Sequence, residues 1–258
     1  MCKINPIIGE PAAIVENRER TLVIADIHLG IEVELSGFGL HIPNQTEKLL
    51  NRILKYILDS KPDRMVILGD LKHNIPLASR IEEYGLPELL NGILKHTMID
   101  IIPGNHDGKI GDLLPAHKNI TLHGVEGAVI DGVGYFHGHA WPSEEVLGAE
   151  HLMMGHNHPV IQFADKFGYT LHRRVWIRAK CNFDLLKDHY PTLKDWHDPY
   201  CTIMPAFNEL CGGITFNTKQ GEDLLGPMSS HILLIDEAEV YLLDGTSIGK
   251  IGDIKREQ

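Results

Sequence analysis

The sequence predicts an α/β fold in which two β-sheets face one another and helices cover their outer sides. Up to residue 102, short apolar runs alternate with stretches of helical periodicity, the pattern of strand–helix units. From residue 119 onward, strand-like runs follow one another with glycine turns and little helix between them. Strand–helix units build a sheet covered by helices, and the later strands need a second sheet against which to bury their apolar faces.

The first part of the chain contains a predicted hairpin, two helical regions and two further strands. The helix after Asn44 is expected to be capped by that residue, with Glu47 returning the bond, and to end before Pro62. Its apolar residues recur at helical spacing, which predicts one face that packs on a sheet. In order, we expect a hairpin over residues 12–25, the helix from Asn44, a strand at 64–68, a helical region at about 77–96 interrupted at 85–87, and a strand at 98–102.

The second part of the chain consists mainly of short predicted strands, and nothing in it suggests a linker, an internal repeat or a low-complexity segment. We therefore expect one domain over residues 1–258, with a motif core at 20–160 and a strand-rich C-terminal part at 172–258. The expected elements are strands at 119–123, 127–131, 133–137, 151–154 and 159–164, a short helix at 143–148, and strands and turns at 203–208, 212–216 and 240–245.

Composition indicates an ordinary globular protein. Of the 258 residues, 43% are hydrophobic and 23% are charged, and the net charge of −11 argues against broad nonspecific binding to nucleic acid. No apolar run approaches the roughly 20 residues that span a bilayer, and the N-terminus lacks the apolar core of a signal peptide. The four cysteines show no paired spacing, as in a reducing compartment; a zinc site of Cys181, Cys201 and Cys211 is the less favoured alternative. These features predict a cytoplasmic protein without a membrane segment.

Metal-binding side chains follow the predicted strands. Because the carboxyl ends of strands in an open α/β sheet are where ligands bind, these side chains are expected to converge on one edge. Carboxylate and amide oxygens beside imidazole nitrogens are the ligand mixture of a two-metal hydrolytic site. The stretches concerned are Asp26-Ile27-His28, Gly69-Asp70, Gly104-Asn105-His106-Asp107, His137-Gly138-His139 and Gly155-His156-Asn157-His158.

These five stretches, in this order, resemble the five motifs of calcineurin-like metallophosphoesterases, and residues 172–258 resemble the tail of their small SbcD-related, ICC-like branch. The resemblance implies a four-layer α/β/β/α sandwich of two mixed sheets with outer helices. It also implies two divalent metal ions, with manganese the first choice and iron, zinc, nickel or magnesium as alternatives. The implied ligands are Asp26, His28 and His158 for one ion, Asn105, His137 and His156 for the other, and Asp70 bridging both.

The resemblance also assigns roles beside the metals. His106 would be the general acid that protonates the leaving group, with Asp107 orienting it. The usual pairing in the family favours His137 over His139 as the ligand, which leaves His139 near the substrate, as Asn105 also is. The segment Gly69-Asp70-Leu71-Lys72-His73 is similar to a motif of the SbcD-type repair nucleases. This similarity would place His73 near the phosphate; the alternative is that His73 is an ordinary loop histidine.

The segment after His28 is expected to form a loop over the site, residues 29–43. Glu32 in this loop is interpreted as a surface carboxylate that starts a helix, and a metal ligand is the alternative. The loop and residues 172–258 are expected to shape the pocket, and neither indicates the oligomeric state.

We therefore expect a phosphoesterase in which metal-bound hydroxide attacks phosphorus in line. A phosphodiester, in a nucleotide or nucleic acid, is the preferred substrate, because the motifs and their flanks supply Lys72 and Lys109 but no arginine except Arg64, which starts a strand. A monoester dianion usually calls for cationic forks such as arginine. The alternatives are a phosphomonoesterase, and a noncatalytic scaffold of the same fold that binds a partner chain.

Overall fold

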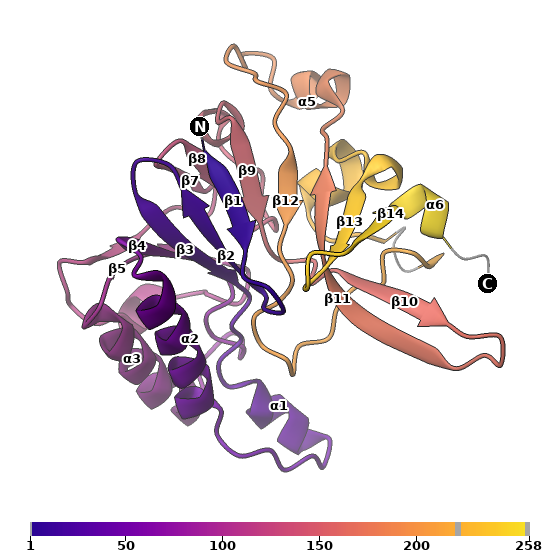
Figure 1. Ribbon diagram of the computed structural model, residues 1–258. Helices are drawn as coiled ribbons and strands as arrows, with labels where there is room; N and C mark the ends of the chain where they lie inside the picture. The colour runs from indigo at the N-terminus through magenta and orange to yellow at the C-terminus, as the bar shows by residue number, and fades with distance from the viewer. Residues whose placement is uncertain (1, 220–222, 256–258) are drawn as a thin grey trace.

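The computed structural model describes residues 2–219 and 223–255 and contains two mixed β-sheets (Figure 1). The first sheet has the strand order β1-β2-β3-β4-β5-β6, antiparallel from β1 to β3 and parallel from β3 to β6. The second sheet has the order β14-β13-β11-β12-β9-β8-β7, and β10 pairs with β11 beside this path. The α/β fold class with two mixed sheets and outer helices is therefore as predicted.

The elements of the N-terminal part, up to residue 122, build the first sheet and its cover. They are β1 (Lys3–Pro6), β2 (Ala12–Glu16), β3 (Arg20–Ala25), α1 (Ile31–Gly37), α2 (Thr46–Ser60), β4 (Arg64–Leu68), α3 (Arg80–Leu94), β5 (Met98–Ile102), the 3-10 helix η1 (Ile110–Leu113) and β6 (Ile120–Leu122).

The later elements build the second sheet and its cover. They are β7 (Ala128–Ile130), β8 (Val133–Tyr135), α4 (Glu144–Leu147), β9 (His151–Met154), β10 (Val160–Ala164), β11 (Thr170–Ala179), α5 (Phe183–His189), β12 (Cys201–Ile203), the π-helix η3 (Met228–Ile232), the 3-10 helix η4 (Ile235–Glu237), β13 (Glu239–Leu242), β14 (Ser247–Lys250) and α6 (Ile251–Ile254).

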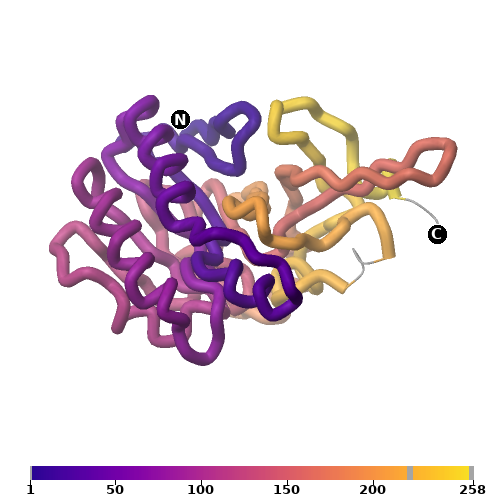
Figure 2. The backbone as a smooth tube through the Cα atoms, turned by 90° about the horizontal axis from the view of Figure 1, so that it is seen from below, coloured from indigo at the N-terminus to yellow at the C-terminus, as the bar shows by residue number. Residues whose placement is uncertain are grey.

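Helices α2 and α3 lie side by side on the outer face of the first sheet, as Figures 1 and 2 both show. Most of the apolar stripe of α2 is buried there, with Leu49, Ile53 and Ile57 packed among side chains of the sheet such as Leu22 and Ile67, while Leu58 at the end of the stripe is exposed. An amphipathic helix gains its stability from such a face rather than from intrinsic propensity. The expected stripe therefore positions the helix as predicted.

Side chains of both sheets meet between the two layers. Alternate residues of a strand point to opposite faces, so Val23 and Val66 of the first sheet meet Val133, Met153 and Trp176 of the second. The outer face of the second sheet is covered by short helices, and Leu147 of α4, Leu186 of α5, Met228 of η3 and Ile251 of α6 belong to that core. None of the helices in the described ranges is long and apolar enough to cross a membrane.

Several expected boundaries are wrong. Helix α2 begins at Thr46, and its N-cap is Gln45 rather than Asn44. The side chain of Asn44, one residue before the N-cap, accepts a bond from the backbone amide of Thr46. Glu47 does not complete a capping box. Helix α3 runs without interruption through Pro87, because its capping box at Ser79 and Glu82 and its buried apolar face outweigh the cost of one proline.

The expected loop at residues 29–43 contains helix α1, and Glu32 on it is buried rather than at the surface. Its Oε1 accepts a bond from the amide of Gln45, which ties α1 to the start of α2. The strand expected near residue 120 is present but extends the first sheet, in parallel with β5. Strands β1, β11 and β14 and helices α5, η3 and α6 have no counterpart in the predicted elements. The extent of the domain, residues 1–258, stays a prediction.

Candidate metal centre

Two clusters of metal-binding side chains lie at the carboxyl ends of β3, β4, β8 and β9. We call Asp26, His28, Asp70 and His158 the first cluster, and Asp70, His137 and His156 the second cluster. Within each cluster, one donor atom per residue lies within 4.8 Å of every other, and Asp70 belongs to both. The sheets thus bring together every expected histidine and carboxylate ligand from segments distant in the sequence.

Sharp turns of the backbone aim these side chains at one point. Five expected ligands have positive φ angles, a region that residues other than glycine rarely adopt. Strained backbone of this kind persists where the surrounding structure fixes it, and it concentrates at functional sites. The angles are 57° at Asp26, 43° at His28, 48° at Asp70, 73° at His156 and 44° at His158.

His137 is oriented as a ligand would be. Its Nδ1 lies 3.1 Å from the carbonyl oxygen of Leu68, to which it donates, so Nε2 is the nitrogen left to bind an ion once it is unprotonated. That Nε2 is buried, has no hydrogen-bond partner among the described residues and lies 3.4 Å from Oδ2 of Asp70. Metal-ligating histidines typically donate their other ring nitrogen to a carbonyl in this way. An orphaned buried nitrogen beside a carboxylate fits a divalent cation.

The loop that carries His156 and His158 is held from two sides. Nδ1 of His158 lies 3.0 Å from the carbonyl oxygen of Gly212, which leaves Nε2 facing Asp26. The side-chain amide of Asn157, between these two histidines, donates to the carbonyl of Leu225 and to Oγ of Ser229. The turn is therefore fixed by buried bonds to the C-terminal part.

The charges in the two clusters are strongly coupled. Burial alone would lower the pKa of His137, but the carboxylates of Asp70 and Asp26 outweigh burial and raise it to about 9. Burial lowers the pKa of His28 to about 3 and that of His156 to about 4. Burial would raise the pKa of Asp70, but the neighbouring His137 and His28 hold it well below its usual range. The metal-free site therefore keeps anionic carboxylates, as a cation site requires.

The remaining substrate and ligand candidates occupy different places. Asn105 is exposed and lines the cavity above the clusters. His139 is not among the described residues that line that cavity. Its ring centroid lies 5.2 Å from that of His137 and 6.1 Å from that of His156, and its Nδ1 is buried without a hydrogen-bond partner within residues 2–219 and 223–255. Between the two competing histidines, the second cluster contains His137.

His106 and Asp107 do not form the expected pair. The ring of His106 donates from Nδ1 to the carbonyl of His73 rather than to Asp107. Asp107 is buried, and its oxygens accept bonds from the amides of Gly104, Leu71 and Lys72 at 2.8, 2.9 and 3.2 Å. Asp107 thus joins the loop after β5 to the loop after β4, and the contact of the His106 ring is with the carbonyl of His73 instead.

His73 reaches the site, but both of its ring nitrogens are engaged. Nδ1 lies 3.1 Å from Nδ1 of His28, and Nε2 contacts a carboxylate oxygen of Glu34. His73 therefore lines the cavity near the expected phosphate, but neither ring nitrogen is free to contact it directly. The neighbouring Lys72 is also occupied, because its buried ammonium donates to the carbonyls of Asn74 and His106.

Two residues near the clusters were missed by sequence reasoning. Glu34 lies on α1, in the segment we interpreted as a loop, and Cys211 has a thiol within 4.8 Å of ring nitrogens of His28 and His158. Neither stands in a motif or at a ligand spacing, so only the folded chain reveals them. All four cysteines are free, and the zinc site of three cysteines is not formed, since Cys211 lies with the histidines instead.

A cavity of about 330 Å³ opens above both clusters. Among the described residues that line it, none is an arginine or a lysine. It is lined by His28, Ile31, Asp70, His73, Asn105, His106, His156, Asn157, His158, Cys211, Gly212, Gly213, Ile214 and Leu225.

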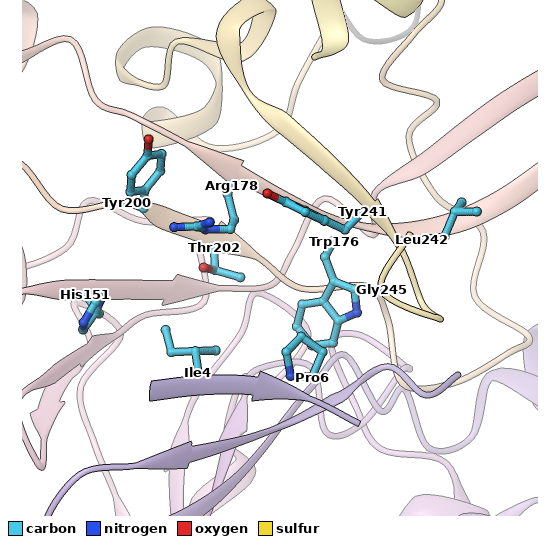
Figure 3. Close-up of a pocket in the computed structure, with 10 residues that line it drawn as sticks. All are labelled: Ile4, Pro6, His151, Trp176, Arg178, Tyr200, Thr202, Tyr241, Leu242 and Gly245. Carbon is cyan, nitrogen blue, oxygen red and sulfur yellow. The ribbon is translucent and has the colours of Figure 1, made fainter. Parts of the chain in front are cut away.

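A second cavity, of about 390 Å³, lies between β1 and the second sheet and contains none of the expected site residues (Figure 3). Its wall carries Trp176, Tyr200 and Tyr241, and the guanidinium of Arg178 lies 4.4 Å from the ring centroid of Tyr200. His151, which starts β9, lines this cavity, whereas the two clusters follow the end of that strand. The second cavity is therefore separate from the candidate metal centre.

Comparison with known proteins places the chain in a family. The profile of the family described as Calcineurin-like phosphoesterase matches residues 19–216, and no curated protein sequence matches the chain. Among solved structures, the nuclease MPE of Pseudomonas putida is 20% identical, with a TM-score of 0.49, over 94% of this chain and 98% of that one. Yfce, a phosphoesterase from E. coli, is 15% identical, with a TM-score of 0.42, over 89% of this chain and 97% of that one. Since the profile spans well over half of the chain and all five motifs, the protein belongs to the calcineurin-like phosphoesterase family, whose members are hydrolases acting on ester bonds.

Proposed function

We propose that this chain is a dinuclear, metal-dependent phosphodiesterase. The observation that carries the proposal is the pair of ligand clusters that share Asp70 beneath a cavity without arginine or lysine among its described lining residues. A shared carboxylate offsets the repulsion of two cations held close together, and two cations can stand in for the positive side chains that the cavity lacks.

The donors fit two divalent cations. The first ion would be held by Asp26, His28 and His158, the second by Asn105, His137 and His156, with Asp70 common to both. Carboxylate and amide oxygens favour manganese, while the histidines keep iron, zinc, nickel and magnesium as alternatives. When bound, such ions supply an activated water and polarise the phosphoryl oxygens.

Two residues of the chain are proposed to act directly on the substrate. His106 lines the cavity, and its Nδ1 is engaged with the carbonyl of His73, so its Nε2 is available to give a proton to the departing oxygen. The exposed amide of Asn105 is placed to donate to a phosphoryl oxygen as well as to offer its carbonyl oxygen to an ion. His139, which is set back from the cavity, is proposed to support the second cluster.

The preference for a diester follows from the missing cationic fork. A monoester carries about two negative charges near neutral pH, because its second pKa is near 6, and sites for it commonly add arginine. Here Lys72 is tied to two carbonyls, and Arg174, the candidate from the 172–180 segment, donates to the carbonyl of Ala206. A diester carries only one negative charge. It therefore needs less positive charge around it, and the two ions can supply this without an arginine or lysine.

The proposed physiological substrate is a nucleotide or nucleic acid diester. A cavity of about 330 Å³ accommodates the phosphodiester and one flanking group, and a longer chain would extend over the rim. The proposed location is the cytoplasm, which the four free thiols support.

A comparison of two model esters tests the proposal. The purified protein, loaded with Mn²⁺, is assayed on bis-nitrophenyl phosphate and on nitrophenyl phosphate. We expect a higher kcat/KM on the diester, and loss of both activities in a chelator. If the monoester is the better substrate with each of the five metals, the phosphomonoesterase alternative replaces the proposal. Activity that persists after metal removal would contradict metal dependence itself.

A further inference from the structure

Three side chains form a line from the surface of α1 to the buried first cluster. A carboxylate oxygen of Glu34 contacts Nε2 of His73, Nδ1 of His73 lies 3.1 Å from Nδ1 of His28, and Nε2 of His28 lies 3.4 Å from Oδ2 of Asp70. The line thus crosses from a half-exposed carboxylate to a buried imidazole at the floor of the cavity. Both nitrogens of His73 and Nδ1 of His28 are engaged in this line, whereas Nε2 of His28 is left facing Asp70 and also lies 3.3 Å from Nε2 of His158.

The positions of the protons follow from counting donors. A carboxylate only accepts, so the bond between Glu34 and His73 requires a proton on Nε2 of His73. In a neutral ring the other nitrogen then carries a lone pair, and Nδ1 of His73 accepts. The proton in its contact with His28 therefore belongs to Nδ1 of His28. This leaves the lone pair of His28 on Nε2, the atom that faces Asp70.

We propose that Glu34 and His73 are positioning residues that hold His28 in the tautomer with a free Nε2 lone pair. The inference rests on the proposed metal centre, because that tautomer is the one that can bind an ion next to Asp70. It makes α1 a part of the centre and gives His73 a role through His28 rather than on the substrate. The rotation of the His28 ring is fixed by the same two contacts.

The position of α1 supports this role. Buried Glu32 anchors the helix to the amide of Gln45, and the side chain of Asn74 lies 3.3 Å from the carbonyl oxygen of Gly30, just before α1 begins. The backbone amide of His73 also donates to the carbonyl of Leu29 at 3.0 Å. Glu34 and His73 are thus presented by segments that are bonded to each other, and their contact does not depend on a free loop.

The first test reads the tautomer directly. Long-range ¹H–¹⁵N NMR spectra of the metal-free, full-length protein distinguish Nδ1–H from Nε2–H in each histidine ring. We expect Nδ1–H at His28 in the wild type, and a mixture of the two tautomers in Glu34→Ala and in His73→Ala. Nε2–H at His28 in the wild type, or the same tautomer in all three proteins, would overturn the proposal.

The second test measures Mn²⁺ binding by titration calorimetry, without any substrate. Loss of an outer partner of a histidine ligand typically weakens binding about 10–100-fold, and we expect this for the first ion in His73→Ala. Glu34→Ala should weaken it less, and Glu34→Gln should restore it, since the carbonyl oxygen of the glutamine accepts the same bond. Glu83→Ala, which removes an exposed carboxylate from α3, is the matched control and should bind as the wild type does.

The outcomes separate this inference from the proposed function. Unchanged Mn²⁺ affinity in both alanine variants contradicts the positioning role of Glu34 and His73, whatever the activity of the wild type. Suppose instead that the wild type binds Mn²⁺ tightly, that the variants bind it more weakly, and that the wild type hydrolyses no diester. This result supports the positioning role and contradicts the proposed function. If His73→Ala fails to fold, the half-exposed Glu34 provides the deciding variants.

Discussion

Oδ2 of Asp70 lies 3.4 Å from Nε2 of His137. The same oxygen lies 3.4 Å from Nε2 of His28, so one atom stands between the two clusters. The other oxygen accepts a bond from the amide of His106 at 2.9 Å, which links the carboxylate to the loop that carries the proposed general acid. The position of this single side chain therefore links the two candidate metal clusters to the loop that carries His106.

Replacement of Gly104 by alanine should damage the metal centre. A Cβ at Gly104 would lie 2.5 Å from the backbone nitrogen of Asp70 and even closer to its Oδ1. Real Cβ atoms do not approach backbone so closely, so one of the two loops must shift and carry Asp70 with it. We expect Gly104→Ala to lose bound metal and most of the activity, as measured by elemental analysis and by assay on a diester.

Gly108 provides the control in the same loop, because a Cβ there has no neighbour within 4 Å. Gly108→Ala should keep the wild-type metal content. Equal metal content in both alanine variants would show that Asp70 tolerates displacement, contrary to the role described here.

Asp107 should matter for stability rather than for proton transfer. Asp107→Ala leaves the buried amides of Gly104, Leu71 and Lys72 without their acceptor. Each such group costs about 1–3 kcal/mol, so the free energy of unfolding in urea should fall by more than about 2 kcal/mol. Asp112→Ala, on the exposed side of η1, should change it by less than about 0.5 kcal/mol. If Asp107→Ala instead keeps the stability of the wild type and loses much of its kcat, Asp107 has a direct role in the reaction.

His106→Ala should have an effect that depends on the leaving group. A general acid contributes on the order of 10²–10⁴ in rate, and it matters most when the leaving oxygen is strongly basic. We expect a large loss of kcat on a nucleotide diester and a much smaller loss on a nitrophenyl ester, in steady-state assays. A similar loss on both substrates would indicate that His106 positions the substrate instead.

Metal binding should release protons below about pH 9. Burial alone would lower the pKa of His137, yet Asp70 and Asp26 raise it to about 9, so the metal-free ring holds a proton at neutral pH. An ion needs the unprotonated Nε2, and that proton must therefore leave when the ion binds. The apparent affinity should rise with pH, by about tenfold per unit for each proton released, and level off above about pH 9.

Calorimetry in buffers with different ionisation enthalpies measures this release. The observed heat of Mn²⁺ binding at neutral pH should vary linearly with the buffer's enthalpy. A heat that is independent of the buffer, together with an affinity that does not change with pH, would contradict a protonated His137.

The sequence predicts those elements of this protein whose local pattern of apolar residues matches their burial in the fold. The runs before Asp26, Asp70 and Asn105 are apolar and short, and each forms the expected strand. These three strands run parallel, so their carboxyl ends converge as the motifs require. Likewise, the apolar stripe from Leu49 to Leu58 specified α2. A strand flanked by glycine turns leaves few alternative ways to bury its side chains.

Features set by tertiary contacts could not be predicted in the same way. The apolar face of α3 overrides the local effect of Pro87, and α1 is fixed by the burial of Glu32 against the start of α2. The partners of His73 and Asp107 depend on which loops meet at the sheet edge, and no spacing in the sequence encodes that meeting.

The metal content of Asp70→Asn tests the central claim most directly. Elemental analysis of the purified wild type, after loading with Mn²⁺ and removal of free metal, should give two ions per chain. The variant keeps the shape of the side chain but loses the charge that both ions share, so it should hold fewer than one ion per chain while its circular dichroism remains that of the wild type. Two ions per chain in the folded variant would contradict a metal centre that is bridged by Asp70.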